Sequence, residues 1–159
     1  MRGGRALNYV VSSRPIVIHS LAHARAALAA AASLSVPVTL HSAPGAGAQA
    51  GPAWFERVIA AARAEFPHVA VTAILDCDDA PGAVMAALRW LKEPGRTAVM
   101  LSFSGEASAA ARLRDMAAVI GVELICGTPP GLDLRTEPDA LAACRVWLAE
   151  TTAERVAPR

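Results

Sequence analysis

Five short apolar runs along the chain are each followed by a small group of polar residues. The runs lie within positions 16–18, 36–40, 69–75, 98–101 and 122–125. Apolar residues fill these runs without alternation, which is typical of strands in a buried parallel sheet. The carboxyl ends of parallel strands meet at one edge of a sheet, where ligands bind. The pattern therefore predicts a functional site at that edge.

Helical segments separate the apolar runs. We predict strands at 15–19, 37–41, 68–76, 97–102 and 122–126, and helices at about 21–34, 52–66, 81–92, 106–120 and 139–151. Pro52 and Pro81 each suit the first turn of a helix, where a missing N–H is harmless. Gly121 suits the position that ends a helix. The segment 127–138 is expected to be a rigid loop.

These elements form five βα units and predict an α/β fold with a parallel sheet covered by helices on both faces. One architecture that fits is a partial, half TIM barrel, because a complete eight-unit barrel needs about 250 residues. The alternative is a flavodoxin-like doubly wound sheet. We expect a single domain over 14–152, an irregular lead-in over 1–13 and a flexible tail over 153–159.

Composition supports a folded globule and excludes some partners. The 159 residues are 54% hydrophobic and 18% charged, with a net charge of +1. That near-neutral charge argues against a dedicated nucleic-acid binder. Apolar runs are shorter than the roughly 18 residues of a membrane span, and no signal peptide is evident. The three cysteines lack disulfide-type spacing. These features predict a cytoplasmic protein that does not contact a membrane.

The loop 43–51 follows the second strand and consists mostly of glycine and alanine. Exposed amides and the dipole of the next helix would favour a phosphate or carboxylate there. The same small residues equally permit close packing without a ligand. The loop has neither the P-loop pattern nor the dinucleotide-binding pattern. The candidate ligand-binding residues are Ser42, Gly45, Ala46, Gly47, Gly51, Ser102 and Ser104.

An acidic cluster, 76–79, follows the third strand. Asp76 is the candidate catalytic residue, because a carboxylate at a strand end can act as general acid or base. Asp79 is assigned to capping the next helix. The candidate ligands for a divalent metal such as zinc are His19, His41, Cys77 and Cys126. They come one per strand, and hydrogen-bonded structural histidines are commoner, so no metal is favoured.

The order of motifs resembles the amino-terminal half of class II fructose/tagatose-bisphosphate aldolases. The residues that carry the resemblance are Ala26–Ala32, Ser35–Ala46, Gly51, Ile74–Cys77 and Val99–Ser102. The resemblance implies a zinc-dependent TIM barrel in which Asp76 matches the catalytic proton donor. Cys77 stands where the family has its first zinc-binding histidine, Ile74 replaces the preceding histidine, and Asp78 replaces a glycine. The metal-ligand motif is therefore not retained.

Three hypotheses follow for function. The first is an aldolase-related half-barrel that binds a small anionic or phosphorylated metabolite at the strand ends. The second is a metal-dependent lyase of the aldolase type. The third is a non-enzymatic assembly protein, in which tryptophans at 54, 90 and 147 could anchor an interface. Association into a homodimer would also complete an unclosed barrel.

Overall fold

The computed structural model describes the backbone of residues 14–156 and the side chains of residues 14–150; the predicted lead-in 1–13 and the end of the tail, 157–159, lie outside the described residues. The strands are β1 (Ile16–Ile18), β2 (Val38–Ser42), β3 (Val71–Asp76), β4 (Met100–Phe103), β5 (Leu124–Cys126) and β6 (Leu132–Asp133). The helices are α1 (Leu21–Leu34), α2 (Ala46–Gln49), α3 (Pro52–Glu65), α4 (Pro81–Leu91), α5 (Ala107–Val119), the 3₁₀ turn η1 (Leu134–Thr136) and α6 (Ala140–Val156).

All six strands form one parallel sheet in the order β5-β4-β3-β2-β1-β6. The first five strands are neighbours in sequence order, as in a barrel. A flavodoxin-like sheet has the order 2-1-3-4-5, which would place β1 between β2 and β3. The α/β class is therefore confirmed, and the strand order is that of the predicted partial barrel.

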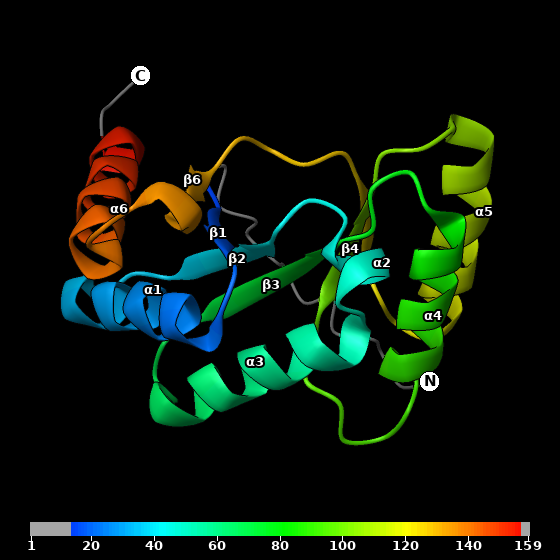
Figure 1. Ribbon diagram of the computed structural model, residues 1–159, viewed down its shortest axis with the longest axis horizontal. Helices are drawn as coiled ribbons and strands as arrows, with labels where there is room; N and C mark the ends of the chain where they lie inside the picture. The colour runs from blue at the N-terminus through cyan, green and yellow to red at the C-terminus, as the bar shows by residue number, and fades with distance from the viewer. Residues whose placement is uncertain (1–13, 157–159) are drawn as a thin grey trace.

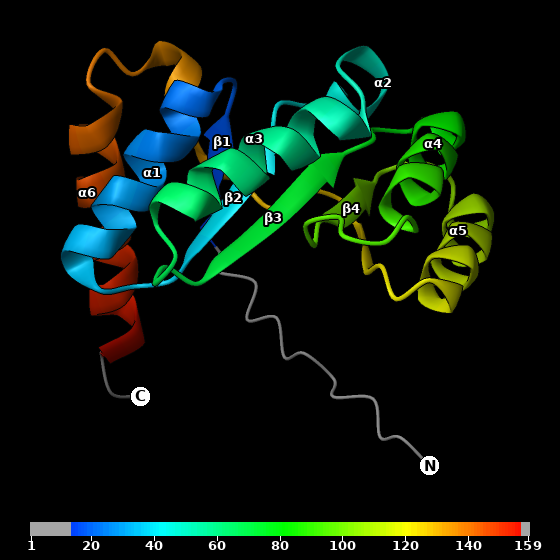
Figure 2. The ribbon, with the colours of Figure 1, turned by 90° about the horizontal axis from the view of Figure 1, so that it is seen from below.

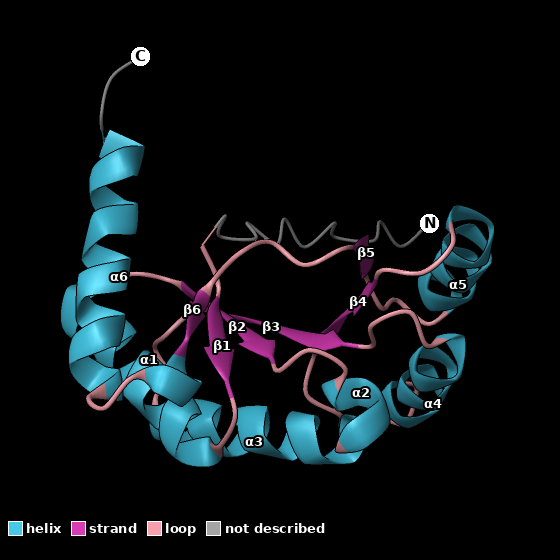
Figure 3. Ribbon diagram, turned by 45° about the horizontal axis from the view of Figure 1, so that its top comes forward, coloured by secondary structure: helices cyan, strands magenta, loops and turns pink. Residues whose placement is uncertain are grey.

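The helices of the described residues lie along one face of this sheet, so the expectation of helices on both faces is wrong (Figure 3). Sequential strands joined by right-handed crossovers place every helix on the same side. Figures 1 and 2 show α1 beside α6 at one end and α4 beside α5 at the other. Apolar strand runs also suit a barrel, whose inner face is filled by side chains.

The two faces of the sheet differ in composition. Leu40, Leu75 and Leu101 are fully buried in the core between the sheet and the helices. Positions that alternate with them, including His41 and Asp76, belong to the opposite face. That face, where polar and apolar residues mix, is the counterpart of a barrel interior.

Local signals place the helix ends. The Ser20 hydroxyl accepts the His23 N–H at the start of α1. Pro52 and Pro81 are the first residues of α3 and α4, and Gly121, at φ 74°, follows α5, as predicted. Ala80, not Asp79, precedes α4, and its side chain makes no cap, so the capping role of Asp79 is wrong.

The carboxyl-terminal third differs most from expectation. The segment 127–138 contains β6 and η1 in addition to a loop, and residues 14–156 form six strands where five were predicted. Helix α6 runs to Val156, into the segment 153–159 that was expected to be a flexible tail. Strand β6 pairs with β1, on the side away from β2.

The loop 127–131, here called the crossing loop, joins the two edges of the sheet along the face opposite the helices (Figure 3). Strands about 4.8 Å apart would place β5 and β6 roughly 24 Å apart in a flat sheet. An extended chain from Cys126 to Leu132 reaches only about 20 Å. The sheet must therefore curl toward the crossing loop, as a barrel wall does.

Gly131 allows the crossing loop to meet the start of β1. A Cβ atom at this position would lie 2.4 Å from the Pro15 carbonyl oxygen. The same oxygen accepts the Leu132 N–H at 3.0 Å, which begins the β1–β6 contact. We expect Gly131→Ala to lower the free energy of unfolding by about 1–3 kcal/mol through this clash, as measured by urea denaturation.

A matched control is Gly82→Ala in the first turn of α4, where a Cβ atom would meet nothing within 4 Å. This change should be neutral or stabilising, by up to about 1 kcal/mol, because alanine favours helix more than glycine does. Equal stability of the Gly131→Ala variant and the unaltered protein would contradict the role assigned to the close approach.

Candidate functional site

The carboxyl ends of the strands form a rim that is organised around Asp76. Its Oδ1 accepts the N–H groups of Gly45 at 2.9 Å and Asp78 at 2.8 Å. Its Oδ2 accepts the hydroxyls of Ser102 at 3.2 Å and Thr128 at 2.7 Å. One carboxylate therefore joins the loop after β2, the loop after β3, β4 and the crossing loop.

Burial and hydrogen bonding act in opposite directions on Asp76, which is 7% exposed. Burial alone would raise the pKa of this carboxyl. The hydrogen bonds from Gly45, Thr128 and Asp78, together with the nearby His41, outweigh burial and hold the pKa of Asp76 below its ordinary value. The side chain is thus ionised at neutral pH.

The hydrogen bonds of Asp76 show that its carboxylate holds the surrounding loops in position. A carboxylate offers about four lone-pair sites, and four donors occupy them here. A general acid at neutral pH needs a raised pKa, whereas the pKa of Asp76 is lowered. The catalytic role of Asp76 remains a prediction, and it requires some of these four donors to move away.

The small-residue loop after β2 is folded onto the end of β3. A Cβ atom at Gly47 would lie 2.8 Å from the Cys77 sulfur, so glycine permits this close packing. The N–H groups of Gly45, Ala46 and 48–51 all donate within the protein. Beyond them, the first turn of α3 has no side-chain cap and no acidic residue. The backbone N–H groups of this first turn have no side-chain acceptor and could therefore bind an anion.

The serines among the candidate ligand-binding residues already have partners. Ser42 Oγ donates to the Ala43 carbonyl at 3.1 Å and accepts the Asp76 N–H at 2.9 Å. Ser104 Oγ donates to Asp78 Oδ1 at 3.2 Å. Asp78 has a left-handed backbone, with φ 50°. These contacts hold the rim in shape, and ligand binding by the serines remains a prediction.

Two of the candidate metal ligands are cysteines in different surroundings. Cys77 is fully buried, and this burial, followed by the charge of Asp76, raises the pKa of its thiol to about 12. The thiol is therefore protonated at neutral pH, whereas a metal needs the thiolate. Cys126 is exposed, and Arg114 Nη2 lies 2.8 Å from its sulfur.

The third candidate ligand, His41, is 1% exposed and faces the barrel-interior side of β2. Its Nδ1 lies 2.8 Å from the Ser42 carbonyl oxygen, which can only accept, so Nδ1 carries the proton. Burial, the largest influence, lowers the pKa of His41 and keeps the ring neutral. Nε2 is then a buried acceptor that has no hydrogen-bond partner among the described residues.

The fourth candidate, His19, belongs to a cluster that sequence reasoning missed. His19 Nε2 lies 2.6 Å from Asp133 Oδ1, and Arg135 Nη2 lies 3.2 Å from His19 Nδ1. A guanidinium can only donate, so Nδ1 accepts and Nε2–H donates to Asp133. Asp133 lies in β6, which is too short to show a strand pattern. No sequence signal would therefore have brought these residues together.

The four candidate ligands do not form a metal site. Within the part of the chain that the structure describes, no group of three or more histidine, cysteine and acidic side chains could hold a metal ion. His19 is engaged with Asp133, Cys77 is protonated, and Cys126 contacts Arg114. The residues present do not fit the zinc centre that the aldolase resemblance implies.

Comparison with known proteins places the fold. No family model and no curated protein sequence matches this chain. Among solved structures, the chain is similar to a protein from Coccidioides immitis assigned as a fructose-1,6-biphosphate aldolase, with a TM-score of 0.53 and 21% identity. The match covers 72% of this chain and 46% of that chain, so this chain spans less than half of that protein. The predicted resemblance to part of an aldolase is confirmed as a likeness of fold.

No helix among the described residues is long and apolar enough to cross a membrane.

Replacing the central carboxylate should destabilise the fold. We expect Asp76→Ala to lower the free energy of unfolding by roughly 3 kcal/mol, because the buried N–H groups of Gly45 and Asp78 would lose their acceptor. Asp76→Asn should cost less, since the hydroxyls of Ser102 and Thr128 can turn to accept from an amide. Urea denaturation of both variants measures the difference.

The pH dependence tests the same carboxylate. Because the folded pKa of Asp76 lies below the unfolded value near 3.8, its stabilisation is complete above that value. This stabilisation is lost as the pH falls through the lower, folded pKa. Below about pH 4, the unaltered protein should therefore lose more stability than Asp76→Asn does. The same loss in both proteins would contradict the ionised state assigned to Asp76.

Proposed function

We propose that the protein binds a small anionic metabolite of the sugar-phosphate class at the carboxyl-end rim. The proposal rests on the first turn of α3, which follows β2 and α2 at this rim. Its first turn has no side-chain cap and no acidic residue, and Gly51 before it leaves open space at its Cβ position. Free N–H groups and the helix dipole together favour a phosphate.

The fold supports the same location. Ligands of parallel α/β sheets bind at the carboxyl ends of the strands. The solved structure that shares this fold bears the name of an enzyme acting on a sugar bisphosphate. Because Asp76 holds the loops on both sides of the rim, it would keep the start of α3 in place for the ligand.

Phosphorylated compounds should stabilise the folded protein. In thermal unfolding, dihydroxyacetone phosphate, fructose 1,6-bisphosphate and inorganic phosphate are compared with the uncharged dihydroxyacetone and fructose. A ligand at a hundred times its Kd adds about 2.7 kcal/mol, which raises Tm by several degrees. No shift with any phosphorylated compound at millimolar concentration would overturn the proposal.

A negative charge introduced at the start of α3 tests whether the anion binds there. Ala53→Asp adds a carboxylate to the first turn of α3, which suits the helix dipole and should repel an anion. The variant should remain folded and lose the ligand-induced shift. Gly82→Asp makes the corresponding change in the first turn of α4 and should keep the shift. Equal loss in both variants would contradict binding at α3.

Self-association is a second candidate function, favoured by a groove of about 510 Å³ along β6 and α6. Trp147 lines this groove, and Val146, which also lines it, is 61% exposed. At the opposite edge, Val119 at the end of α5 is 86% exposed, and Met116 one turn before it is 45% exposed. The groove is lined by acidic residues, including Glu137 and Asp139. The exposed apolar side chains at the two edges favour head-to-tail contact between copies.

Sedimentation of paired variants tests this association. Val119→Glu and Val146→Glu, each alone, should reduce association to the monomer, because each places a charge at one side of the contact. Mixed in equal amounts, they should form a dimer through the one pair of unaltered surfaces. Met85→Glu, on the outer face of α4, should behave as the unaltered protein. A monomeric unaltered protein at high concentration would overturn this candidate.

A further inference from the structure

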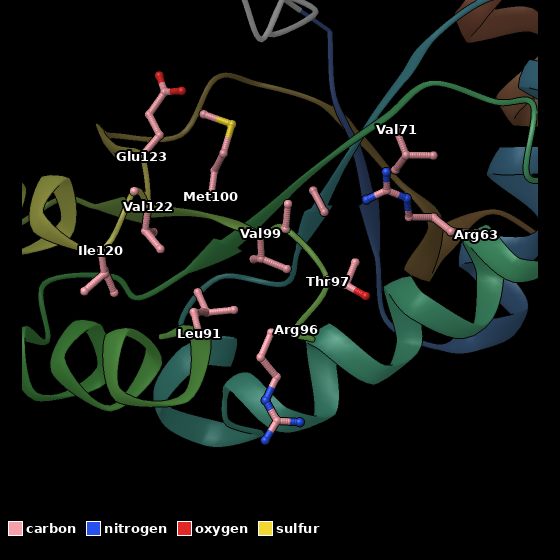
Figure 4. A pocket seen from close by; sticks show the side chains of 13 residues that line it. Arg63, Val71, Leu91, Arg96, Thr97, Val99, Met100, Ile120, Val122 and Glu123 are labelled. Atoms are coloured by element: carbon pink, nitrogen blue, oxygen red, sulfur yellow. The ribbon is translucent and has the colours of Figure 1, made fainter. Parts of the chain in front are cut away.

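A cavity of about 390 Å³ lies at the amino ends of β3, β4 and β5, at the opposite end of the strands from the rim (Figure 4). Side chains from the sheet, from the ends of α3 and α4, and from the segment before β5 enclose it. Its walls combine polar side chains with an apolar patch formed by Val71, Val99, Met100, Ile120 and Val122. Cavities of this size and character are typical of small-molecule sites.

The cavity exists because the sheet opens between β3 and the segment that leads into β4. β3 pairs with β2 from Val71 onward. Its pairing with β4 begins only at Ile74 and Met100. Before Ile74, β3 therefore has no ladder with the segment that leads into β4.

Two contacts hold the incoming segment away from β3. The buried Glu56 of α3 accepts the Thr97 N–H at 2.9 Å. The Arg96 guanidinium lies 3.6 Å from the centre of the Trp90 ring on α4. These contacts hold the segment before β4 against α3 and α4. Its backbone therefore does not extend the hydrogen-bonded pairing between β4 and β3. The opening is thus built into the fold.

The lining of the cavity contains two guanidinium groups, those of Arg63 and Arg96, and neither forms an ion pair among the described residues. Arg63, in the last turn of α3, lines the cavity, and Figure 4 shows its guanidinium beside Val71. No ion pair of Arg63 occurs among the residues that the structure describes. Glu123, the acidic residue of the lining, lies across the cavity (Figure 4). Arg96 lies over the Trp90 ring, and its buried Nε has no hydrogen-bond partner among the described residues. Figure 4 shows its guanidinium directed away from Val99, Ile120 and Val122, so Arg63 is the group that faces the apolar wall.

We propose that this cavity binds a small carboxylic acid with an apolar body. The carboxylate would pair with the Arg63 guanidinium, which matches its planar geometry. The apolar body would lie against Val99, Ile120 and Val122. The edge of β3 at Val71 and Ala73 borders the same space. This site is independent of the rim, because it lies at the other end of the strands.

Three probe compounds separate the contributions of charge and apolar surface. 3-Phenylpropionate carries both a carboxylate and an apolar body, 3-phenylpropanamide lacks the charge, and acetate lacks the body. Titration calorimetry should show 3-phenylpropionate binding at least tenfold more tightly than either of the others, as a charge-assisted hydrogen bond requires. No binding of 3-phenylpropionate at millimolar concentration, or equal binding of the amide, would overturn the proposal.

Matched variants locate the binding. Arg63→Gln should weaken 3-phenylpropionate at least tenfold, whereas Arg112→Gln, at an exposed position on α5, should leave it unchanged. Ala98→Phe adds a ring from the wall of the cavity and should abolish binding while the protein remains folded. If binding survives in both Arg63→Gln and Ala98→Phe, the compound binds elsewhere and the proposal fails.

Hydrogen exchange gives a readout that does not depend on any variant. Bound 3-phenylpropionate should slow amide exchange in peptides covering 71–73 and 97–99, which border the opening. Peptides covering the crossing loop at the rim should be unaffected. Protection confined to the rim would show that the compound occupies the other end of the strands, and would overturn this assignment.

Discussion

The hydrogen bonds of Asp76 are the interaction on which the arrangement of the rim depends. Four donors from three loops and one strand converge on this carboxylate. Thr128 brings the crossing loop into the set, and that loop leads directly to β6. A buried carboxylate would be costly without these donors, since burial penalises its charge. The contribution of this carboxylate to stability therefore depends on its hydrogen-bond partners.

The short crossing loop imposes the second constraint. It must span the sheet from β5 to β6, and Gly131 must approach the Pro15 carbonyl closely for β6 to pair with β1. A curled sheet satisfies both requirements, and a curled sheet with sequential strands is part of a barrel wall. The fold likeness to a longer aldolase-type protein thus has a local physical cause in this chain.

The sequence predicts elements whose signals are local and misses those that depend on distant partners. The five apolar runs, the helix-opening Pro52 and Pro81 and the helix-ending Gly121 predict the first five strands and the long helices between them. The short helix α2 was missed, because it lies within the Gly/Ala segment 43–51 that was predicted as a loop. Strand β6 was missed, because two residues carry no periodicity and only pairing with β1 defines them. Likewise, Asp76 was recognised as important, but its partner Thr128 lies far along the chain.

The two ends of the sheet differ in how completely their polar groups are paired. At the rim, the side chains of Asp76 and Ser42 are fully engaged, and the donors left over belong to the start of α3. At the amino end, the β3–β4 ladder begins only at Ile74, and Arg63 lies beside a cavity with a mixed polar and apolar lining. Unpaired polar groups next to enclosed space are where a ligand adds most to stability, because it supplies contacts the fold lacks. In barrels, the amino ends of the strands commonly serve stability and the carboxyl ends bind ligands. In this molecule, polar groups are less completely paired at the amino ends than at the rim.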